Sequence, residues 1–147
     1  MQQFSYASVS TADASRLLID VREILNEARH FNFEHQISGA LYYADGHYFQ
    51  CLEGDEATLD ILLQKLHKDK RHHQIRLFQR KNIEKKQFQE WSMKFVGRQS
   101  PVKQALIDMG FSQFTPTQFT QDQADYLIRF LTRAQDTDFN ELQRNAV

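Results

Sequence analysis

The chain is poor in the residues that build cross-linked, fibrous or disordered proteins. Among its 147 residues there is a single cysteine, Cys51, with two prolines and five glycines. One cysteine cannot form an intrachain disulfide, so a disulfide-stapled secreted scaffold is excluded. The low proline and glycine content excludes collagen-like and low-complexity architectures. For a chain of this length we expect one globular domain around one core.

Neither sign of charge dominates, and long apolar runs are absent. Lys and Arg total 18 and Asp and Glu total 19, for a formal net charge of −1. This balance lacks the one-sided field of a dedicated nucleic-acid or membrane-surface binder, so neither partner is expected. No stretch approaches the roughly 20 apolar residues that cross a bilayer, and the amino terminus does not resemble a signal peptide. We therefore expect a soluble protein of the reducing cytoplasm.

Local patterns predict a β-α-β-β-α order over the first half of the chain. Residues 3–8, 37–43 and 47–53 are predicted strands, and Asp45-Gly46 favours a tight hairpin turn between the last two. Ser10 and Asp13 resemble a capping box before a first helix. Apolar residues at helical spacing define two helices. They are Leu17, Leu18, Val21, Ile24, Leu25 and Ala28 in the first, and Leu59, Leu62, Leu63 and Leu66 in the second, which Asp55 is expected to cap.

The second half predicts two more strands and two more helices. The strands are residues 75–78 and 91–95, the latter with Trp91, Met93 and Phe95 on one side. Helix start and stop signals are Ser100-Pro101 and Gly110 for one helix, then Thr120 and Gln123 for another that carries Leu127, Ile128 and Leu131. The polar segment from Gln135 onward is expected to fray.

This order fits an α+β fold, a ferredoxin-like β-α-β-β-α-β-β sheet. Two helices would lie on one face and the C-terminal helical pair on the other. On the third strand Tyr48, Gln50 and Leu52 share one face, while Phe49 and Cys51 share the opposite one, so both faces should be covered. The fold hosts unrelated functions and does not by itself identify one.

Three polar side chains fall on faces that should otherwise pack together. Asn32 follows Ile24 at i+8 near the end of the first apolar stripe, Gln50 lies within the third strand, and Tyr6 lies within the first. An unpartnered buried amide or hydroxyl costs about 1 to 3 kcal/mol. The three either satisfy one another in a core network or bind a polar ligand, and the patterns alone leave both open.

A set of short motifs is spread in order over about the first 96 residues. The motifs are Tyr6-x-Ser8, Ile24-Leu25-x-x-Ala28-Arg29-x-x-Asn32, Ile37-Ser38-Gly39-x-Leu41-x-Tyr43, Gly46-x-x-Phe49-Gln50-x-Leu52-Glu53-Gly54, Asp69-x-Arg71-His72 and Trp91-Ser92-Met93. Together they resemble the BLUF family, the blue-light sensors using flavin, and the combination is far more specific than any single motif. Ser38 stands where the family often has Thr, and Phe31 where a polar residue or His is also seen. The resemblance implies a flavin-binding domain over residues 1–96, with residues 97–147 as a helical extension packed on the sheet in the same structural domain.

The resemblance implies a flavin held noncovalently between the two helices, with its edge toward the sheet. Asn32 and Gln50 would bond the polar edge of the ring. Arg71, and also His72, would reach its O2 side or the ribityl and phosphate tail; their alternative is a solvated helix exit, where basic residues are favoured. The other implied cofactor contacts are Ile24 and Leu66 as apolar walls, with Tyr6, Ser8, Arg29, Asp69 and Met93. The implied cofactor is FAD, with FMN as the alternative.

The resemblance also implies a photocycle without substrate turnover, so the chain is expected not to be an enzyme. An excited flavin is a strong oxidant, and Tyr6 would give up an electron and then a proton. Rotation or tautomerisation of Gln50 would add a hydrogen bond to the flavin C4 carbonyl and shift absorption to the red, because an amide has a donor and an acceptor end. Trp91 and Met93 would carry the signal to the C-terminal helices, with core packing as their alternative role.

The output is expected to pass through contacts with a downstream regulatory protein in trans, and a homo-oligomer is compatible with the resemblance. The main alternative is a ferredoxin-like interaction module without chromophore, which would be colourless. An acyl-phosphatase-like enzyme would need an anion-cradling loop, but Ser8 to Ala14 contains neither glycine nor arginine.

Metal binding and thiol chemistry are not expected. His67, His72 and His73 lack the spacing of a zinc site. Cys51 lies on the strand face opposite Gln50 and is predicted to be a packed thiol.

Overall fold

A mixed sheet forms the centre of the molecule in the computed structural model, which describes residues 1–97 and 101–136. Its strands are β1 (Gln2–Ser10), β2 (Ser38–Ala44), β3 (His47–Gly54), β4 (His72–Leu77), β5 (Lys81–Asn82) and β6 (Lys94–Val96). The strand order is β4-β1-β3-β2-β6, and the two residues of β5 pair with β1. The pairings among β1 to β4 are antiparallel, whereas β6 runs parallel to β2. The predicted α+β, ferredoxin-like arrangement is confirmed.

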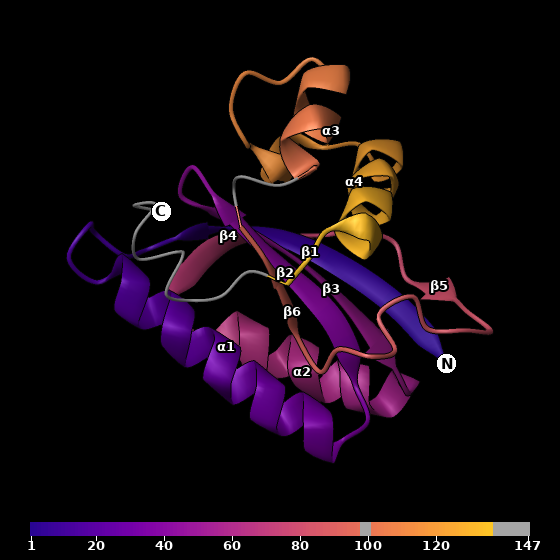
Figure 1. Cartoon of the computed structure of the whole chain (residues 1–147). Coiled ribbons are helices and arrows are strands. Elements are labelled where there is room, and N and C mark those ends of the chain that lie inside the picture. Colours follow the sequence, from indigo (N-terminus) through magenta and orange to yellow (C-terminus); the bar gives the residue numbers. More distant parts are fainter. Residues whose placement is uncertain (98–100, 137–147) are drawn as a thin grey trace.

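Helices cover both faces of the sheet (Figure 1). The helices are α1 (Leu17–Glu34), α2 (Glu56–Lys68), α3 (Val102–Asp108) and α4 (Gln121–Arg133), with a 3-10 turn, η1 (Pro116–Gln118), between the last two. Side by side on one face lie α1 and α2, and on the other lie α3 and α4. Within the described ranges no helix is long and apolar enough to cross a membrane.

Each face of the sheet has its own apolar core, as the alternation along β3 predicts. Tyr48 and Leu52 belong to the core beneath α1 and α2. Phe49 and Cys51 belong to the core beneath α3 and α4. Because adjacent residues of a strand point to opposite faces, β3 is buried on both sides.

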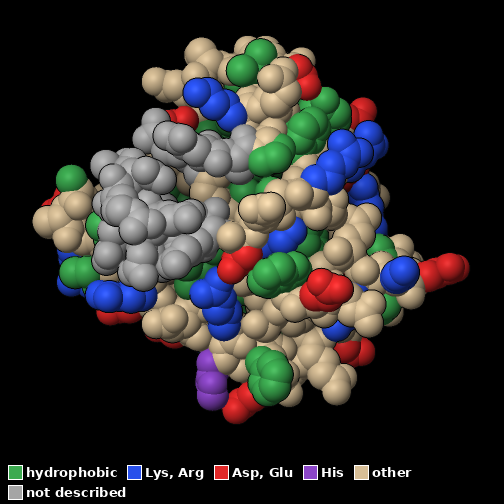
Figure 2. All heavy atoms as spheres, in the orientation of Figure 1, with side chains coloured by type: hydrophobic (Ala, Val, Ile, Leu, Met, Phe, Trp, Pro, Cys, Tyr) green, Lys and Arg blue, Asp and Glu red, His purple; other side chains and the backbone are tan. Residues whose placement is uncertain are grey.

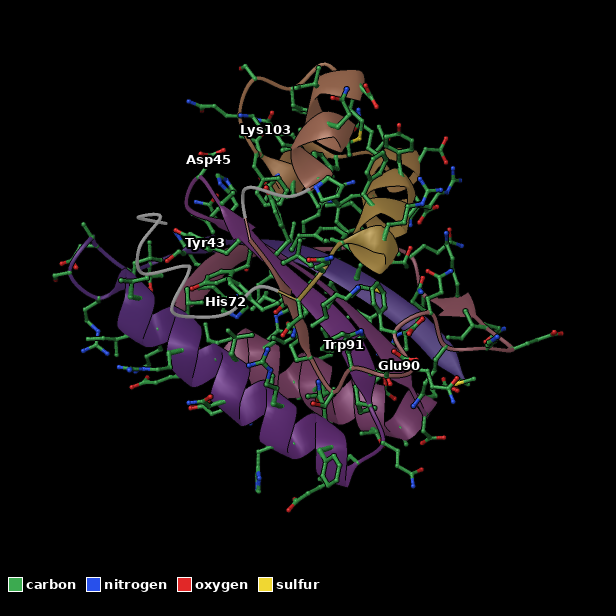
Figure 3. All side chains as sticks on the ribbon, in the orientation of Figure 1. Tyr43, Asp45, His72, Glu90, Trp91 and Lys103 are labelled. Atoms are coloured by element: carbon green, nitrogen blue, oxygen red, sulfur yellow. The ribbon has the colours of Figure 1, made fainter. Side chains whose placement is uncertain are left out.

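The hairpin between β2 and β3 is built by Asp45 and Gly46. Their φ angles are 51° and 75°, so both residues adopt the left-handed conformation that a two-residue type I′ turn requires. Phe114, from the loop after α3, donates its N–H to Asp45 Oδ2 at 2.8 Å. The turn therefore also anchors the C-terminal layer, and Figure 3 shows Asp45 beside it.

The predicted start of the first helix is wrong. The helix begins at Leu17, and no side chain caps its end. Asp13 Oδ1 instead accepts the N–H groups of Ser15 at 3.0 Å and Arg16 at 3.1 Å. Asp13 thus organises a turn ahead of α1, which a capping-box pattern cannot distinguish from the helix start itself.

The predicted strand 91–95 is also displaced. Strand β6 begins at Lys94, so Trp91 and Met93 precede it. Trp91 donates its N–H to Phe88 O at 2.9 Å, and this turn prevents an extended conformation at that point. The short strand β5 was not predicted, because two residues carry no alternation. The polar tail beyond Asp136 and the helix signal at Ser100 lie outside the described residues.

Candidate functional site

A cavity opens between α1 and α2 above the sheet. The space within it that is open to water-sized molecules is about 160 Å³. The residues that line it come from β1, β2, β3, the two helices, the connection between α2 and β4, and the start of β4. They are Tyr6, Ile24, Glu27, Ala28, Phe31, Asn32, Leu41, Tyr48, Gln50, Leu52, Leu62, Lys65, Leu66, Asp69, Arg71 and His72.

Tyr6 and Gln50 form the polar centre of the cavity floor. They are direct partners in the β1–β3 register, and the Tyr6 hydroxyl donates a hydrogen bond to Gln50 Oε1. Gln50 Nε2 faces Met93 Sδ at 3.6 Å. Burial, followed by the nearby charge of Asp69, raises the pKa of Tyr6 far above its usual value. Tyr6 is therefore a protonated donor throughout the physiological pH range.

Two buried polar atoms in the cavity wall have no hydrogen-bond partner among the described residues. Asn32 Nδ2 donates to Ser92 O at 2.7 Å, which leaves Asn32 Oδ1 unpartnered. The Tyr48 hydroxyl is also unpartnered. Burial raises the pKa of Tyr48, and the nearby Ser10 side chain lowers it in part. The Ser10 and Tyr48 hydroxyls do not, however, meet the geometry of a hydrogen bond. Such orphaned groups are rare in native interiors, and they fit a polar ligand in the cavity.

Arg71 lines the cavity and forms ion pairs with two neighbouring carboxylates. Its Nη2 lies 2.7 Å from both Asp69 Oδ2 and Glu27 Oε2, and its Nε bonds Asp69 Oδ1 at 2.9 Å. Burial works against the charged form of Asp69, but the hydrogen bonds from Arg71 hold the pKa of this carboxyl below its usual value. Arg71 thus ties α1 to the connection between α2 and β4 with fixed geometry.

His72 joins the cavity wall to the end of α2 (Figure 3). Its Nε2 lies 2.8 Å from Leu66 O, and its Nδ1 lies 2.8 Å from Ser8 Oγ. A carbonyl only accepts, so Nε2 carries the hydrogen and Ser8 donates to Nδ1. Burial lowers the pKa of His72, which is consistent with this neutral tautomer.

Most of the predicted cofactor contacts line the cavity. The residues that do so are Tyr6, Ile24, Asn32, Gln50, Leu66, Asp69, Arg71 and His72. Ser8, Arg29 and Met93 are outside the lining: Ser8 orients His72, and Met93 contacts Gln50. Arg29 Nε donates to Met93 O at 3.0 Å, and its contact with the cofactor stays a prediction. Sequence spacing places a residue on a helix face without specifying which neighbour that face meets.

Several lining residues were not predicted. Tyr48 and Leu52 share the β3 face of Gln50, so strand alternation alone could have found them. Lys65 and Phe31 lie on different helices, and Lys65 Nζ is 3.9 Å from the centre of the Phe31 ring. No sequence signal pairs these two residues, because their contact depends on how closely α1 and α2 approach.

Trp91 and Met93 occupy different environments. Met93 is buried against Gln50, whereas Trp91 is only half-buried on the segment before β6 (Figure 3). Lys94 Nζ lies 5.7 Å from the centre of the Trp91 ring. In this structure it is therefore Met93 that contacts the Gln50 amide.

The histidines and the cysteine are the residues that could act as metal ligands or as a reactive thiol. Across the part of the chain that the structure describes, no three His, Cys, Asp or Glu side chains are grouped to hold a metal ion. Burial raises the pKa of the Cys51 thiol well above its usual value, so the thiol stays protonated. Figure 2 shows basic and acidic side chains intermixed on the visible face.

Comparison with known proteins gives one family and several solved structures. The sequence model of the BLUF family, described as sensors of blue-light using FAD, matches residues 1–94. The structure "BlsA ground state" is 37% identical, covers 95% of this chain and 92% of that chain, and has a TM-score of 0.89. "BlsA photo-activated state" is also 37% identical, with coverage of 93% and 98% and a TM-score of 0.87. The dark-state structure of the BLUF protein BlrB is 26% identical, with coverage of 90% and 95% and a TM-score of 0.74. A search of curated proteins finds no match.

Proposed function

The chain belongs to the BLUF family of blue-light sensors that use FAD, and we propose that its photoresponse is carried by the Tyr6–Gln50 pair. It is a photoreceptor with a noncovalently bound flavin, for which FMN is the alternative to FAD. The observation that carries the assignment is the hydrogen bond from Tyr6 to Gln50 in the floor of the cavity between α1 and α2.

The cavity suits the polar edge of a flavin. Asn32 Oδ1 and the Tyr48 hydroxyl are buried and have no hydrogen-bond partner in the described part of the chain, and the Gln50 amide lines the same cavity. Asn32 and Gln50 would bond the ring edge, Ile24 and Leu66 would pack on its faces, and Asp69, Arg71 and His72 would hold the O2 side or the tail. When bound, the flavin supplies the absorption of blue light and, in its excited state, a strong oxidant.

Tyr6 and Gln50 are arranged to move a proton between them. The Tyr6 hydroxyl already points at Gln50 Oε1, so a phenol that loses an electron has an immediate acceptor for its proton. At the other end of the amide the Met93 thioether accepts hydrogen bonds weakly and donates none. Met93 therefore does not lock the amide, and Gln50 is free to exchange its two ends by rotation or tautomerisation.

We infer a sensor rather than an enzyme, because these steps regenerate both side chains and consume no substrate. The output would pass from Met93 and β6 to the C-terminal helices, and from there to a regulatory protein in trans or to a second copy of the chain. Residues 97–147 would act as an extension of the flavin domain, since the buried residues of α3 and α4 pack on the sheet. A cytoplasmic location is part of this proposal.

Absorption spectra before and after blue light test the assignment. We expect a reversible red shift in the wild-type protein, and flavin binding without that shift in Tyr6→Phe and Gln50→Leu. Tyr43→Phe is the matched control, because Tyr43 is a buried tyrosine that does not line the cavity. Normal photocycles in both cavity variants would show that the roles are assigned wrongly, and a colourless wild-type protein would favour an interaction module.

A further inference from the structure

Arg29 lies on the side of α1 that meets the segment before β6. Its Nε donates to Met93 O at 3.0 Å, and its Nη2 lies 3.4 Å from Asp136 Oδ1. Asn32, three residues further along the helix, donates to Ser92 O at 2.7 Å. Since residues three apart share a helix face, α1 holds two successive carbonyls of this segment, Ser92 and Met93.

Asp136, which follows α4, holds the same segment from the other direction. Its Oδ1 accepts the N–H of Phe95 at 2.8 Å. Strand β6 lies at the end of the sheet order, and among the described residues its one paired strand is β2. Asp136 therefore satisfies a backbone group of β6, and Arg29 one of the residue just before it, on the side where a neighbouring strand would pair.

Lys94, between these residues, reaches the end of α4 with its side chain. It is only 5% exposed, and its Nζ lies 3.2 Å from Leu131 O and 3.3 Å from Thr132 O. These carbonyls belong to the last turn of α4, where a cation is favoured. Met93, Lys94 and Phe95 are thus each bonded to α1 or to the chain at the end of α4.

We propose that Arg29 and Asp136 are positioning residues that hold the Met93–Phe95 backbone where the Met93 sulfur meets Gln50, and that they link this backbone to the end of α4. The assignment rests on the proposed role of Gln50. It gives Arg29 a function other than cofactor binding, and it makes the Arg29–Asp136 ion pair the junction between the light-sensing layer and the C-terminal layer.

The first experiment separates positioning from cofactor binding. In Arg29→Gln, Asp136→Asn and the double variant, we expect FAD affinity within about twofold of wild type. The rate of dark recovery should change by roughly fivefold or more, the scale of one lost hydrogen bond. If the two residues act as one unit, the double variant should change no more than the larger single variant. Arg129→Gln, an exposed position on α4, is the control.

The second experiment does not need the flavin. In the cofactor-free full-length chain, hydrogen exchange at the Phe95 amide should accelerate about tenfold in Asp136→Ala and less in Arg29→Gln, because Asp136 is the acceptor of that N–H. A tenfold loss of FAD affinity in Arg29→Gln with unchanged Phe95 exchange would overturn the proposal, as would unchanged dark recovery in all variants. If wild type binds no flavin, the proposed function fails, while the Phe95 exchange still decides whether Asp136 holds β6.

Discussion

The two tyrosine hydroxyls that line the cavity differ in whether they have a hydrogen-bond partner. Tyr6 has a partner in Gln50, whereas the Tyr48 hydroxyl has none among the described residues. A buried hydroxyl without a partner carries a desolvation cost of about 1 to 3 kcal/mol. The two hydroxyls are therefore expected to contribute to stability with opposite signs.

Replacing Tyr48 with phenylalanine tests this difference. In the cofactor-free protein, Tyr48→Phe should leave the free energy of unfolding unchanged or raise it by about 1 kcal/mol, because it removes an unsatisfied group and keeps the ring. Tyr6→Phe is the comparison, since it leaves Gln50 Oε1 without its donor and should lower the same quantity by about 1 kcal/mol. Urea denaturation measures both. A loss at Tyr48 as large as that at Tyr6 would mean that Ser10 satisfies the hydroxyl.

His72 gives the protein a dependence of stability on pH. Its pKa in the folded state is lowered below the ordinary value of 6.5, so the unfolded chain binds a proton more readily near that pH. Stability contributed by neutral His72 is therefore present above 6.5 and is lost as pH falls below that value toward the folded pKa. Thermal unfolding from pH 7 to 5 should show a smaller loss in His72→Gln than in wild type. His73→Gln, which removes an exposed neighbour, should keep the wild-type slope.

The site could be predicted from the sequence wherever a polar residue interrupts an apolar face. Tyr6, Asn32 and Gln50 stand out for this reason, and the cavity brings all three together. Residues whose contacts depend on the distance between helices, such as Lys65, cannot be recognised from the local sequence pattern. The contacts of Arg29 were not predicted for a related reason, because helical spacing does not reveal that Met93 and Asp136 approach its side of α1.

Among the elements of the fold, the helices differ in whether a side chain caps their N-terminal end. In α4 the Thr120 side chain accepts the N–H of Gln123, and the Gln123 side chain accepts the N–H of Thr120. In α2 the corresponding residue, Asp55, stands at the predicted N-cap position, but within the described residues its side chain makes no capping bond, so the predicted side-chain cap is wrong. We expect Thr120→Ala to lower the free energy of unfolding by about 1 kcal/mol, and Asp55→Ala to cost less. Chemical denaturation of the two variants side by side checks this, and equal losses would contradict it.

Sequence patterns predicted the long elements well and the short ones poorly. The first three strands and the helices are long enough for alternation or helical spacing to appear in the residues themselves. The two-residue β5 is formed by pairing with β1 at Gln2 and Gln3, which only tertiary structure reveals. The displaced start of β6 and the uncapped start of α1 both follow turns, where local hydrogen bonds override the pattern.

For the whole molecule, a filled cavity should stabilise the fold. A ligand that binds only the folded chain adds about 2.7 kcal/mol at one hundred times its dissociation constant. FAD should therefore raise the melting temperature of the wild-type protein. Ala28 lines the cavity on α1, so Ala28→Leu should fold yet lose the FAD-induced shift. Ala57→Leu, on the exposed surface of α2, should retain it, and a full shift in Ala28→Leu would place FAD elsewhere.

Because both faces of β3 are buried, residues that lie outside the cavity are connected to Gln50 through the strand. Phe49 and Cys51 never enter the cavity, yet they flank Gln50 along the same backbone and pack beneath α3 and α4. A change in the volume of either side chain should displace the strand, because a close-packed interior has little free space. The speed of the photocycle should therefore respond to substitutions at these two positions, although neither residue lines the cavity.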